Sequence, residues 1–282
     1  MNRGLWRKAI HEARWLLITC VGLMFMFHWT YVWITSRFEK PAIAGLLEGM
    51  SPELRNLFGM EPALIVTVAG RIGLGYIDPI VLLISAAWAT SRGSDVISGE
   101  INRGSMEILL AQPIRRIDVL ATQATVAIAG AVLLGGAAFL GTAAGLATVT
   151  LHETINRNLF LQPAFNLFAV TLFMAGVSTL VSSWDQYRWR VVGILVGFYV
   201  AGMLLQVIGR SVPDVDWVLY LTFLASYEPQ AMVAAIVSDP VHGWADSFAM
   251  SLRFNGILLG LGLAAYALAA AIFCHRDLPA PL

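Results

Sequence analysis

The chain has 282 residues, of which 58% are hydrophobic and 13% are charged, and its mean hydropathy is +0.72. Soluble domains carry about one quarter charged residues, so the composition excludes a soluble globular protein and indicates an integral membrane protein. The formal net charge of zero is a sum over two membrane faces and identifies no class of partner.

Six apolar stretches are long enough to cross a membrane as helices. A hydrocarbon core of roughly 30 Å needs about 20 such residues, because every backbone N–H and C=O must be bonded within the segment. We therefore predict an all-α integral membrane fold, a single domain over residues 1–282 with six transmembrane helices. The predicted spans are residues 15–35, 72–90, 119–150, 164–184, 191–208 and 254–274.

Residues 2–14 precede the first span and are short, basic and amphipathic. On a helical wheel the basic side chains fall largely opposite the apolar ones. Such a helix would lie in the inner interface before the chain turns into the first span. The alternative is a positively charged flank that only sets the topology. The basic residues are Arg3, Arg7, Lys8 and Arg14.

The distribution of Lys and Arg over the connections predicts the orientation. These residues concentrate in the segments that share a side with the N-terminus, and such residues favour the cytoplasm. We therefore predict a multi-pass protein of the cell inner membrane with both termini in the cytoplasm. The two cysteines, Cys20 and Cys274, both fall in predicted spans, so no disulfide framework is indicated.

The two long outer connections, residues 36–71 and 209–253, contain apolar stretches too short or too interrupted to be spans. They fit external helices lying against the bilayer, or broken extensions of the neighbouring spans. Both interpretations stay open.

Two ionisable residues, Arg71 and Asp78, lie at the outer part of the second span. They are seven residues apart and so share one helical face. Unpaired charge inside a bilayer is costly, so these residues are expected to face a partner or a cavity. The simpler interpretation is a structural ion pair near the outer mouth, and the alternative is a polar site on a translocation path or proton relay. Pro79 predicts a kink or break at Asp78.

The most charged part of the chain, "SGEINRGSMEILLAQPIRR" at residues 98–116, lies between the second and third spans. Ile97, Ile101 and Ile108 fall at helical spacing, with charged residues on the other faces. The spacing predicts an amphipathic helix at the inner surface, within a connecting segment of residues 91–118.

This helix is expected to be interrupted and then stopped. Gly104 breaks the pattern, Ser105 can cap a second short helix, and Glu107 falls in the first turn of that helix. Pro113 disfavours helix at the residue before it and ends the segment ahead of the third span. The sequence therefore predicts a bent, rigid segment rather than a simple turn.

Pairs of glycines four residues apart occur in the third, fifth and sixth spans. Small residues at this spacing let helices approach closely, so we expect these faces to pack helix on helix. A contact between two copies of the chain would use the same feature. The pairs are Gly141 and Gly145, Gly193 and Gly197, and Gly256 and Gly260.

The sequence lacks the residues of common catalytic sites. A nucleotide-binding P-loop ends in Gly-Lys-Ser/Thr, but the lysines are Lys8 and Lys40 and neither follows a glycine. The stretch "HETIN" at His152 has Asn156 where a zinc-protease motif needs a second histidine. We expect no catalytic residue, no metal and no cofactor bound by this chain.

Residues 98–116 resemble the signature of the ABC type-2 permease family, in which a glutamate is followed by Gly-Ser/Thr, a Leu-Leu pair, a proline and a closing arginine. Three further stretches resemble family features in the same order: "STLVSSWDQYRWR", "YLTFLASYEPQAMV" and "IFCHRDLPAP". The residues that match the signature are Glu100, Gly104, Ser105, Leu109, Leu110, Pro113 and Arg116.

The resemblance implies a transmembrane subunit of an exporter-type ABC complex. Such complexes contain two permease chains, often identical, and two separate ATPase subunits that bind ATP and Mg. The segment between spans 2 and 3 is then the coupling helix, which sits in a cleft on the ATPase. The residues expected to couple to the ATPase are Glu100, Arg103, Gly104, Ser105, Glu107, Leu109, Leu110, Pro113 and Arg116.

The resemblance also implies the partners. They are the cytoplasmic ATPases, a second copy of the chain, membrane lipid and, in some complexes, an accessory protein on the periplasmic or extracellular side. No nucleic acid is expected.

Two other functions stay open. One is a force-transmitting ABC permease that assists maturation of an envelope protein. The other is an ion-coupled secondary transporter built from three-plus-three repeats, with Asp78 as the coupling carboxylate, although the two halves of the sequence show no convincing similarity. A wide lateral cavity would favour lipid-like cargo over force transmission, and no residue selects among lipids, drugs, polysaccharides and metal-related cargo.

Overall fold

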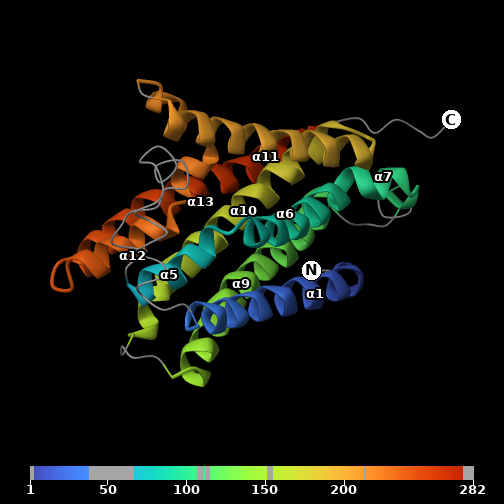
Figure 1. The fold of residues 1–282 in the computed structure, drawn as a ribbon. Coiled ribbons are helices and arrows are strands. Elements are labelled where there is room, and N and C mark those ends of the chain that lie inside the picture. The colour runs from blue at the N-terminus through green and yellow to red at the C-terminus, as the bar shows by residue number, and fades with distance from the viewer. Residues whose placement is uncertain are drawn as a thin grey trace.

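The computed structural model describes residues 3–37, 67–106, 111, 115–150, 155–212 and 214–275. Within these residues every regular element is a helix (Figure 1). Six helical segments are long and apolar enough to cross a membrane. The prediction of an all-α fold with six spans is confirmed.

Four of the six spans are single helices, the fourth span begins with a short turn, and the second span is interrupted several times. The first, third, fifth and sixth spans are α1 (Arg3–Thr35), α9 (Arg116–Thr148), α11 (Arg188–Ser211) and α13 (Gly243–His275). The fourth is a 3-10 turn, η3 (Arg157–Phe160), that leads into α10 (Leu161–Trp184). The second consists of α5 (Val68–Leu74), the 3-10 turn η1 (Gly75–Ile77), α6 (Pro79–Ser94), the π-helical η2 (Asp95–Gly99) and α7 (Glu100–Asn102).

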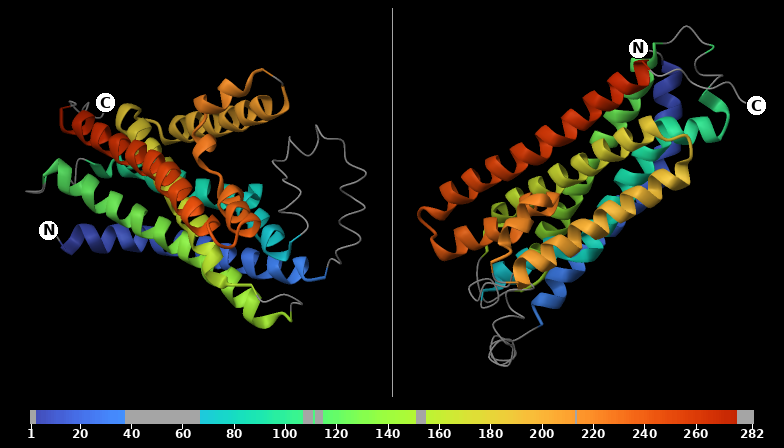
Figure 2. Two further views of the ribbon diagram at one scale, coloured as in Figure 1. Left: turned by 90° about the vertical axis from the view of Figure 1, so that its left-hand side faces the viewer. Right: turned by 90° about the horizontal axis from the view of Figure 1, so that it is seen from above.

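Helix α10 is the centre of the bundle. It packs against α13, α6 and α9, whereas α1 lies along α9 and α11 lies at the periphery (Figures 1 and 2). In the most apolar part of the span that contains α10, 72% of the residues are buried. The corresponding shares are 22% in α1 and 17% in α11. The apolar side chains of α10 itself lie on all of its faces, as expected for a helix enclosed by others.

Two helices extend well beyond the predicted spans. Both α1 and α13 have 33 residues, which corresponds to about 50 Å at 1.5 Å per residue, so their ends project past a hydrocarbon core of roughly 30 Å. Residues 3–14 form the first part of α1 rather than a separate element that turns into the span. At the other end of the chain, α13 begins eleven residues before the predicted span, at Gly243.

The second span breaks where the sequence predicts, at Asp78. The Asp78 carboxylate accepts a hydrogen bond from the Ile80 backbone N–H at 2.9 Å, and Pro79 is the first residue of α6. An aspartate cap followed by proline is a favourable helix start, because the proline lacks an N–H that would have no partner there.

The second outer connection contains short helices packed on the bundle. These are η4 (Asp216–Leu221), η5 (Phe223–Ser226) and α12 (Pro229–Ser238), and α12 packs against α13 and α5. The Tyr227 hydroxyl donates a hydrogen bond to the backbone carbonyl of Tyr76, which ties this connection to the second span. The outer connection therefore combines separate short helices with an extension of the sixth span. Most of the first outer connection, residues 38–66, lies outside the described residues.

One of the three glycine pairs allows close helix packing. A Cβ added at Gly141 would lie 2.4 Å from the carbonyl oxygen of Phe25, and one at Gly145 would lie 2.6 Å from the Cβ of Val32. Both neighbours belong to α1, so α9 and α1 approach at backbone contact. The expectation of helix-on-helix packing is confirmed for this pair.

The other two pairs behave differently. A Cβ added at any of their four glycines would meet no atom within 4 Å in the described part of the chain. Within one chain these faces are therefore not packed in the described residues, because α11 and α13 turn these glycines outward, and the alternative of a contact between two copies stays open. The four residues are Gly193, Gly197, Gly256 and Gly260.

Adding one methyl group at Gly141 should destabilise the protein. We expect Gly141→Ala to lower the free energy of unfolding by about 1–3 kcal/mol, because the backbones of α1 and α9 must separate. The matched control is Gly22→Ala on α1, which adds the same methyl in open space and should be neutral or slightly stabilising, since alanine favours helix. Thermal unfolding in detergent measures both variants, and equal melting temperatures would contradict the packing argument.

Candidate functional site

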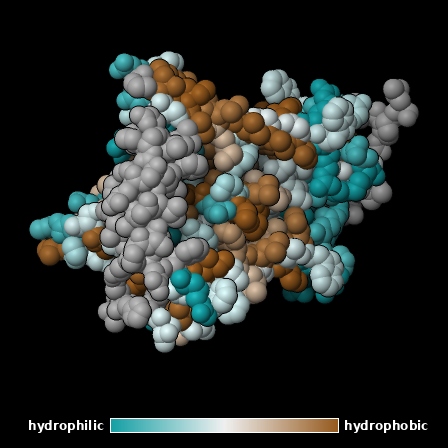
Figure 3. Space-filling view, viewed as in Figure 1, coloured by the Kyte–Doolittle hydropathy of each residue, from teal (hydrophilic) through white to brown (hydrophobic). Residues whose placement is uncertain are grey.

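Charged side chains gather at one end of the bundle, which we call the α7 end. It comprises the first turns of α1, the elements from η2 to α7, the start of α9 and the connection between α10 and α11. Figure 3 shows hydrophilic residues at this end, next to a mainly hydrophobic surface over the helices. The start of α1 and the end of α13 lie at the same end as α7 (Figure 2).

Glu100, in α7, is the most deeply buried acidic residue of this end, with 1% of its surface exposed. Its carboxylate lies 2.6 Å from the Lys8 ammonium and 3.1 Å from the Arg103 guanidinium. The Ser105 hydroxyl donates a further hydrogen bond to the same carboxylate. A buried carboxylate is tolerated when cations and donors surround it in this way. Glu100 therefore joins α7 to the first turns of α1.

Asp95, in η2, is the second acidic centre. Its Oδ1 lies 3.0 Å from Arg103 and 3.1 Å from Arg188, and its Oδ2 lies 3.8 Å from Arg92. Arg103 thus bridges Asp95 and Glu100. Burial alone would lower the pKa of Arg103, but the hydrogen bond and charge of Asp95, with the charge of Glu100, raise that pKa overall. Because Arg188 begins α11, this cluster also connects the second and fifth spans.

Arg92 extends the network into the bundle. It is 2% exposed, and its guanidinium donates to the side-chain oxygen of Gln123, in α9, at 2.9 Å. The network of Lys8, Arg92, Asp95, Glu100, Arg103, Gln123 and Arg188, here called the charge network, therefore links α1, α6, α9 and α11.

The π-helical turn η2 sets the positions of these groups. π-Helical turns are rare and occur often at functional sites. Here the turn lies against the end of α10: the Ser98 N–H donates to the Ser182 hydroxyl at 3.0 Å, and a Cβ added at Gly93 would lie 2.3 Å from the Cβ of Ser178. Small residues in both segments permit this contact. The small polar residues of "STLVSSW" are therefore the surface on which η2 packs.

The predicted break at Gly104 coincides with a turn. Helix α7 ends at Asn102, and Gly104 has a φ of 67°, a left-handed conformation that glycine adopts without strain. Ser105 follows the turn at the start of a further helical stretch, and its hydroxyl donates to the Glu100 carboxylate and to the Glu100 backbone carbonyl. The remaining predicted coupling residues, Glu107, Leu109, Leu110 and Pro113, lie outside the described residues.

Arg116 begins α9 and contacts the end of α13. Its guanidinium donates to the backbone carbonyl of Phe273 at 3.2 Å and lies 6.0 Å from the centre of the Phe273 ring. Phe273 is buried beside Leu120 and Ala269. This contact fastens the start of α9 to the end of α13.

The two charged residues of the outer part of the second span lie apart from the charge network. Arg71 is 8% exposed, in α5, and Asp78 caps α6. Between these two described residues there is no ion pair, so the expected Arg71–Asp78 bridge is wrong. The reason is that η1 and the break at Asp78 interrupt the regular helix that would have placed both on one face.

Sequence reasoning missed five members of the charge network: Lys8, Arg92, Asp95, Gln123 and Arg188. Lys8 and Arg188 read as ordinary basic residues of the inner face, and nothing local indicates that they reach across to the second span. Asp95 gave one usable signal, because it lies where an apolar span ends and a charged segment begins.

Within the described residues no three His, Cys, Asp or Glu side chains gather into a group that could hold a metal ion. The geometry of the α7 end is that of a junction between helices, since each charged group of the charge network is engaged with a neighbour from another element or from the next turn.

Comparison with known proteins identifies the family. Residues 7–278 match the family model described as ABC-2 family transporter protein. A comparison with curated proteins gave no match. The match covers nearly the whole chain and agrees with the family that residues 98–116 resemble.

Removing the charge of Glu100 should destabilise the protein far more than removing that of Glu12. Both carboxylates face Lys8, but Glu12 is 30% exposed and lies 3.9 Å away. We expect Glu100→Gln to lower the free energy of unfolding by about 3 kcal/mol, because cations then lose a buried partner. The matched control Glu12→Gln should cost about 1 kcal/mol or less. Chemical unfolding in detergent measures the difference, and equal effects would contradict the role given to Glu100.

Proposed function

Because the chain belongs to the ABC-2 family of transporter proteins, we propose that it is the permease subunit of an exporter-type complex, driven by a separate ATPase that engages the α7 end. The chain itself supplies the membrane path and the segment between spans 2 and 3 that transmits movement. The partner binds ATP with Mg. The observation that carries this proposal is the charge network, which fixes the segment after α7 to several spans at once.

The network makes the α7 end suitable for transmitting a displacement. A partner that moves the segment after Gly104 pulls on Arg103, which holds both Asp95 and Glu100. Separating buried ion pairs is costly, so the attached helices move with the segment instead of detaching from it. An ATPase that contacts two arrangements of this end differently would shift the equilibrium between them.

The predicted coupling residues divide into two roles under this proposal. Glu100 is buried and engaged within the chain, so it positions the segment and does not reach the ATPase. The Arg103 side chain is 42% exposed and still has surface to offer a partner. Glu107, Leu109, Leu110 and Pro113 stay predicted contact residues of the coupling helix.

Arg116 would pass the movement to the sixth span. It closes the segment at the start of α9 and bonds to Phe273 near the end of α13. A shift of the coupling segment therefore acts on α9 directly and on α13 through this contact.

The α7 end is proposed to face the cytoplasm. The start of α1 carries basic residues at this end, and Arg92, Arg103, Arg116 and Arg188 lie there too, as the preference of Lys and Arg for the cytoplasmic side would place them. Both termini are then cytoplasmic, and the opposite end, at η3 and α12, faces outward.

A second copy of the chain is proposed to pack against α11. This helix is the least buried of the six. Gly193 and Gly197 leave a strip without side chains on the face that points away from the bundle. Small residues four apart favour close contact between membrane helices. Two copies related by a two-fold axis would bury the α11 faces against each other.

The ion-coupled alternative has less support. Asp78, its proposed coupling carboxylate, already acts as the cap of α6. No observation in the described residues favours an ion-gradient mechanism over ATP-driven transport.

The turn at Gly104 provides a test of ATPase coupling that leaves the spans unchanged. We expect Gly104→Val to weaken co-purification with the ATPase and to abolish stimulation of its activity, because a β-branched residue at positive φ is strained. Gly104→Asn is the matched control, since asparagine tolerates the left-handed conformation, and it should keep both. Detergent stability of the chain alone is measured in parallel. Full coupling in the valine variant would contradict the proposed function.

Cysteine crosslinking tests the second copy. In a Cys274→Ser background, which removes an exposed thiol, Gly193→Cys and Gly197→Cys should form disulfide-linked dimers in membranes. Leu133→Cys is the matched control, because Leu133 is also an exposed apolar position, 50% accessible, but lies on α9. Crosslinking at Leu133 and not on α11 would contradict the proposed interface.

A further inference from the structure

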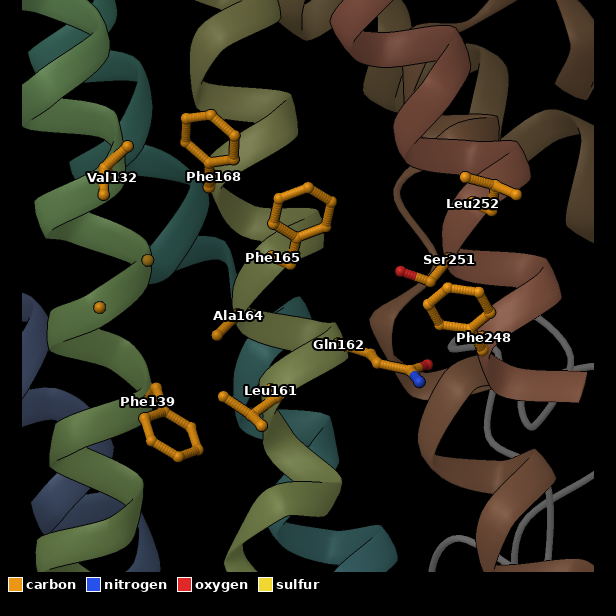
Figure 4. A pocket seen from close by; sticks show the side chains of 12 residues that line it. Val132, Phe139, Leu161, Gln162, Ala164, Phe165, Phe168, Phe248, Ser251 and Leu252 are labelled. Atoms are coloured by element: carbon orange, nitrogen blue, oxygen red, sulfur yellow. The ribbon is translucent and has the colours of Figure 1, made fainter. Parts of the chain in front are cut away.

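A groove of about 560 Å³ lies along α10, between α9 and α13 (Figure 4). Its walls come from the middle of α9 and the first turns of α13, and its floor is the first turns of α10. It is therefore displaced from the α7 end toward the opposite end of the bundle. Val132 and Phe139 on α9, Phe165 on α10, and Phe248 and Leu252 on α13 line it.

The groove exists because α9 and α13 diverge. At the α7 end the two helices are fastened by Arg116 and Phe273. Toward the opposite end they are joined mainly through α10, which packs against both. The space between them widens where the side chains of α10 no longer fill it.

The lining is suited to hydrocarbon. Phe165, Phe248 and Leu252 have 46%, 63% and 68% of their surfaces exposed. The polar oxygen atoms at the rim are already engaged: the Gln162 side-chain oxygen accepts from the Ser247 hydroxyl, and the Ser251 hydroxyl accepts from Asn255 at 2.8 Å. Each of these oxygens therefore already has one partner within the chain, and the rest of the lining is apolar.

The groove also lies at the depth of lipid chains. Its floor begins near Gln162, at the start of the fourth span, and its wall reaches Val132 in the middle of α9, which is near the centre of the third span. The α9 wall from Val132 to Phe139 covers about 10 Å at 1.5 Å per residue, about a third of a hydrocarbon core that is roughly 30 Å thick. With the α7 end in the cytoplasm, this part of the core belongs to the outer leaflet.

A lipid chain fits the groove better than a helix of a partner does. An α-helix with its side chains is about 10 Å across, so 560 Å³ holds only about 7 Å of its length, little more than one turn. A spanning helix would contact the groove over a small part of its length. A thin, flexible acyl chain can follow the groove throughout, and the volume falls within the range of pockets that bind small molecules, about 300–1,000 Å³.

We propose that this groove binds an acyl chain of a phospholipid from the outer leaflet, with its polar headgroup beyond the Gln162 and Ser247 rim. The chain enters sideways from the bilayer, since the groove opens between α9 and α13 rather than into the centre of the bundle. This proposal goes beyond the proposed function and does not depend on the ATPase, but its choice of the outer leaflet rests on the orientation given in the proposed function.

Two adjacent glycines on α9 make the proposal testable. A Cβ added at Gly136 meets no atom within 4 Å, so a large side chain there enters the groove without displacing its walls. A Cβ added at Gly135 would lie 2.8 Å from the carbonyl oxygen of Ala164, so that glycine is needed for packing of α9 on α10. Gly136→Phe is therefore the filling variant. The matched control is Gly22→Phe, which places the same side chain in open space on α1.

The experiment uses the full chain in nanodiscs of palmitoyl-oleoyl phosphatidylcholine that contain a phosphatidylcholine with a photoreactive diazirine in its acyl chain. After illumination, mass spectrometry maps the labelled residues. We expect labelling of residues 132–139 and 248–252 to exceed that of other lipid-facing residues, such as Leu83 on α6, which is 63% exposed. Gly136→Phe should reduce this labelling about tenfold, as expected when roughly two methylene groups lose burial, and Gly22→Phe should not change it.

Three results would overturn the proposal. They are equal labelling of the groove and Leu83, unchanged labelling in Gly136→Phe, and protein–protein products from a photocrosslinker at Leu252, which would identify a partner chain in the groove. If Gly136→Phe fails to fold, Val132→Trp fills the groove from an exposed position of the same wall. ATPase coupling is measured separately through Gly104, so either proposal can fail while the other stands.

Discussion

Glu100 carries a carboxylate with 1% of its surface exposed, and such a group is stable only where cations and donors surround it. Lys8 comes from the first turns of the chain and Arg103 from the turn after α7, so one carboxylate determines where both segments lie. Arg103 extends the arrangement to Asp95 and, through Asp95, to Arg188 at the start of α11. The positions of Arg103 and Ser105, directly after α7, therefore depend on this one buried charge.

The membrane part of the molecule follows a different principle. Helix α10 is enclosed, and its small residues let η2, α6 and α13 approach closely: a Cβ added at Gly176 would lie 2.4 Å from the carbonyl oxygen of Gly262. Helices α1 and α11 are mostly exposed and present apolar side chains outward. The interior is thus organised by close packing of small residues, whereas the α7 end is organised by charge.

The spans were predictable because length and apolarity define them, and the break at Asp78 because proline cannot continue a helix. The turn at Gly104 was predictable from one glycine in an amphipathic pattern. The contacts of Lys8 and Glu100 were not, since the two residues are 92 positions apart and no local pattern relates them. The Arg71–Asp78 bridge failed for the related reason that a regular helix was assumed across a break. Gly193 and Gly141 each begin a pair of glycines four residues apart, so the sequence does not distinguish them. Only the packing of the helices shows that Gly141 lies against α1 and that Gly193 lies on an open face.

Helices α9 and α13 connect the α7 end with the groove. The helices are fastened at the α7 end by Arg116 and Phe273 and are separated by the groove further along. When two rigid helices are held at one end, a small rotation there produces a larger change in their separation at a distance. Under the proposed function, a movement of the coupling segment would therefore change the width of the groove, because the walls of the groove are the two helices that Arg116 joins. A lipid chain in the groove would in turn favour the arrangement with the wider separation, since binding and conformational change are reciprocally linked.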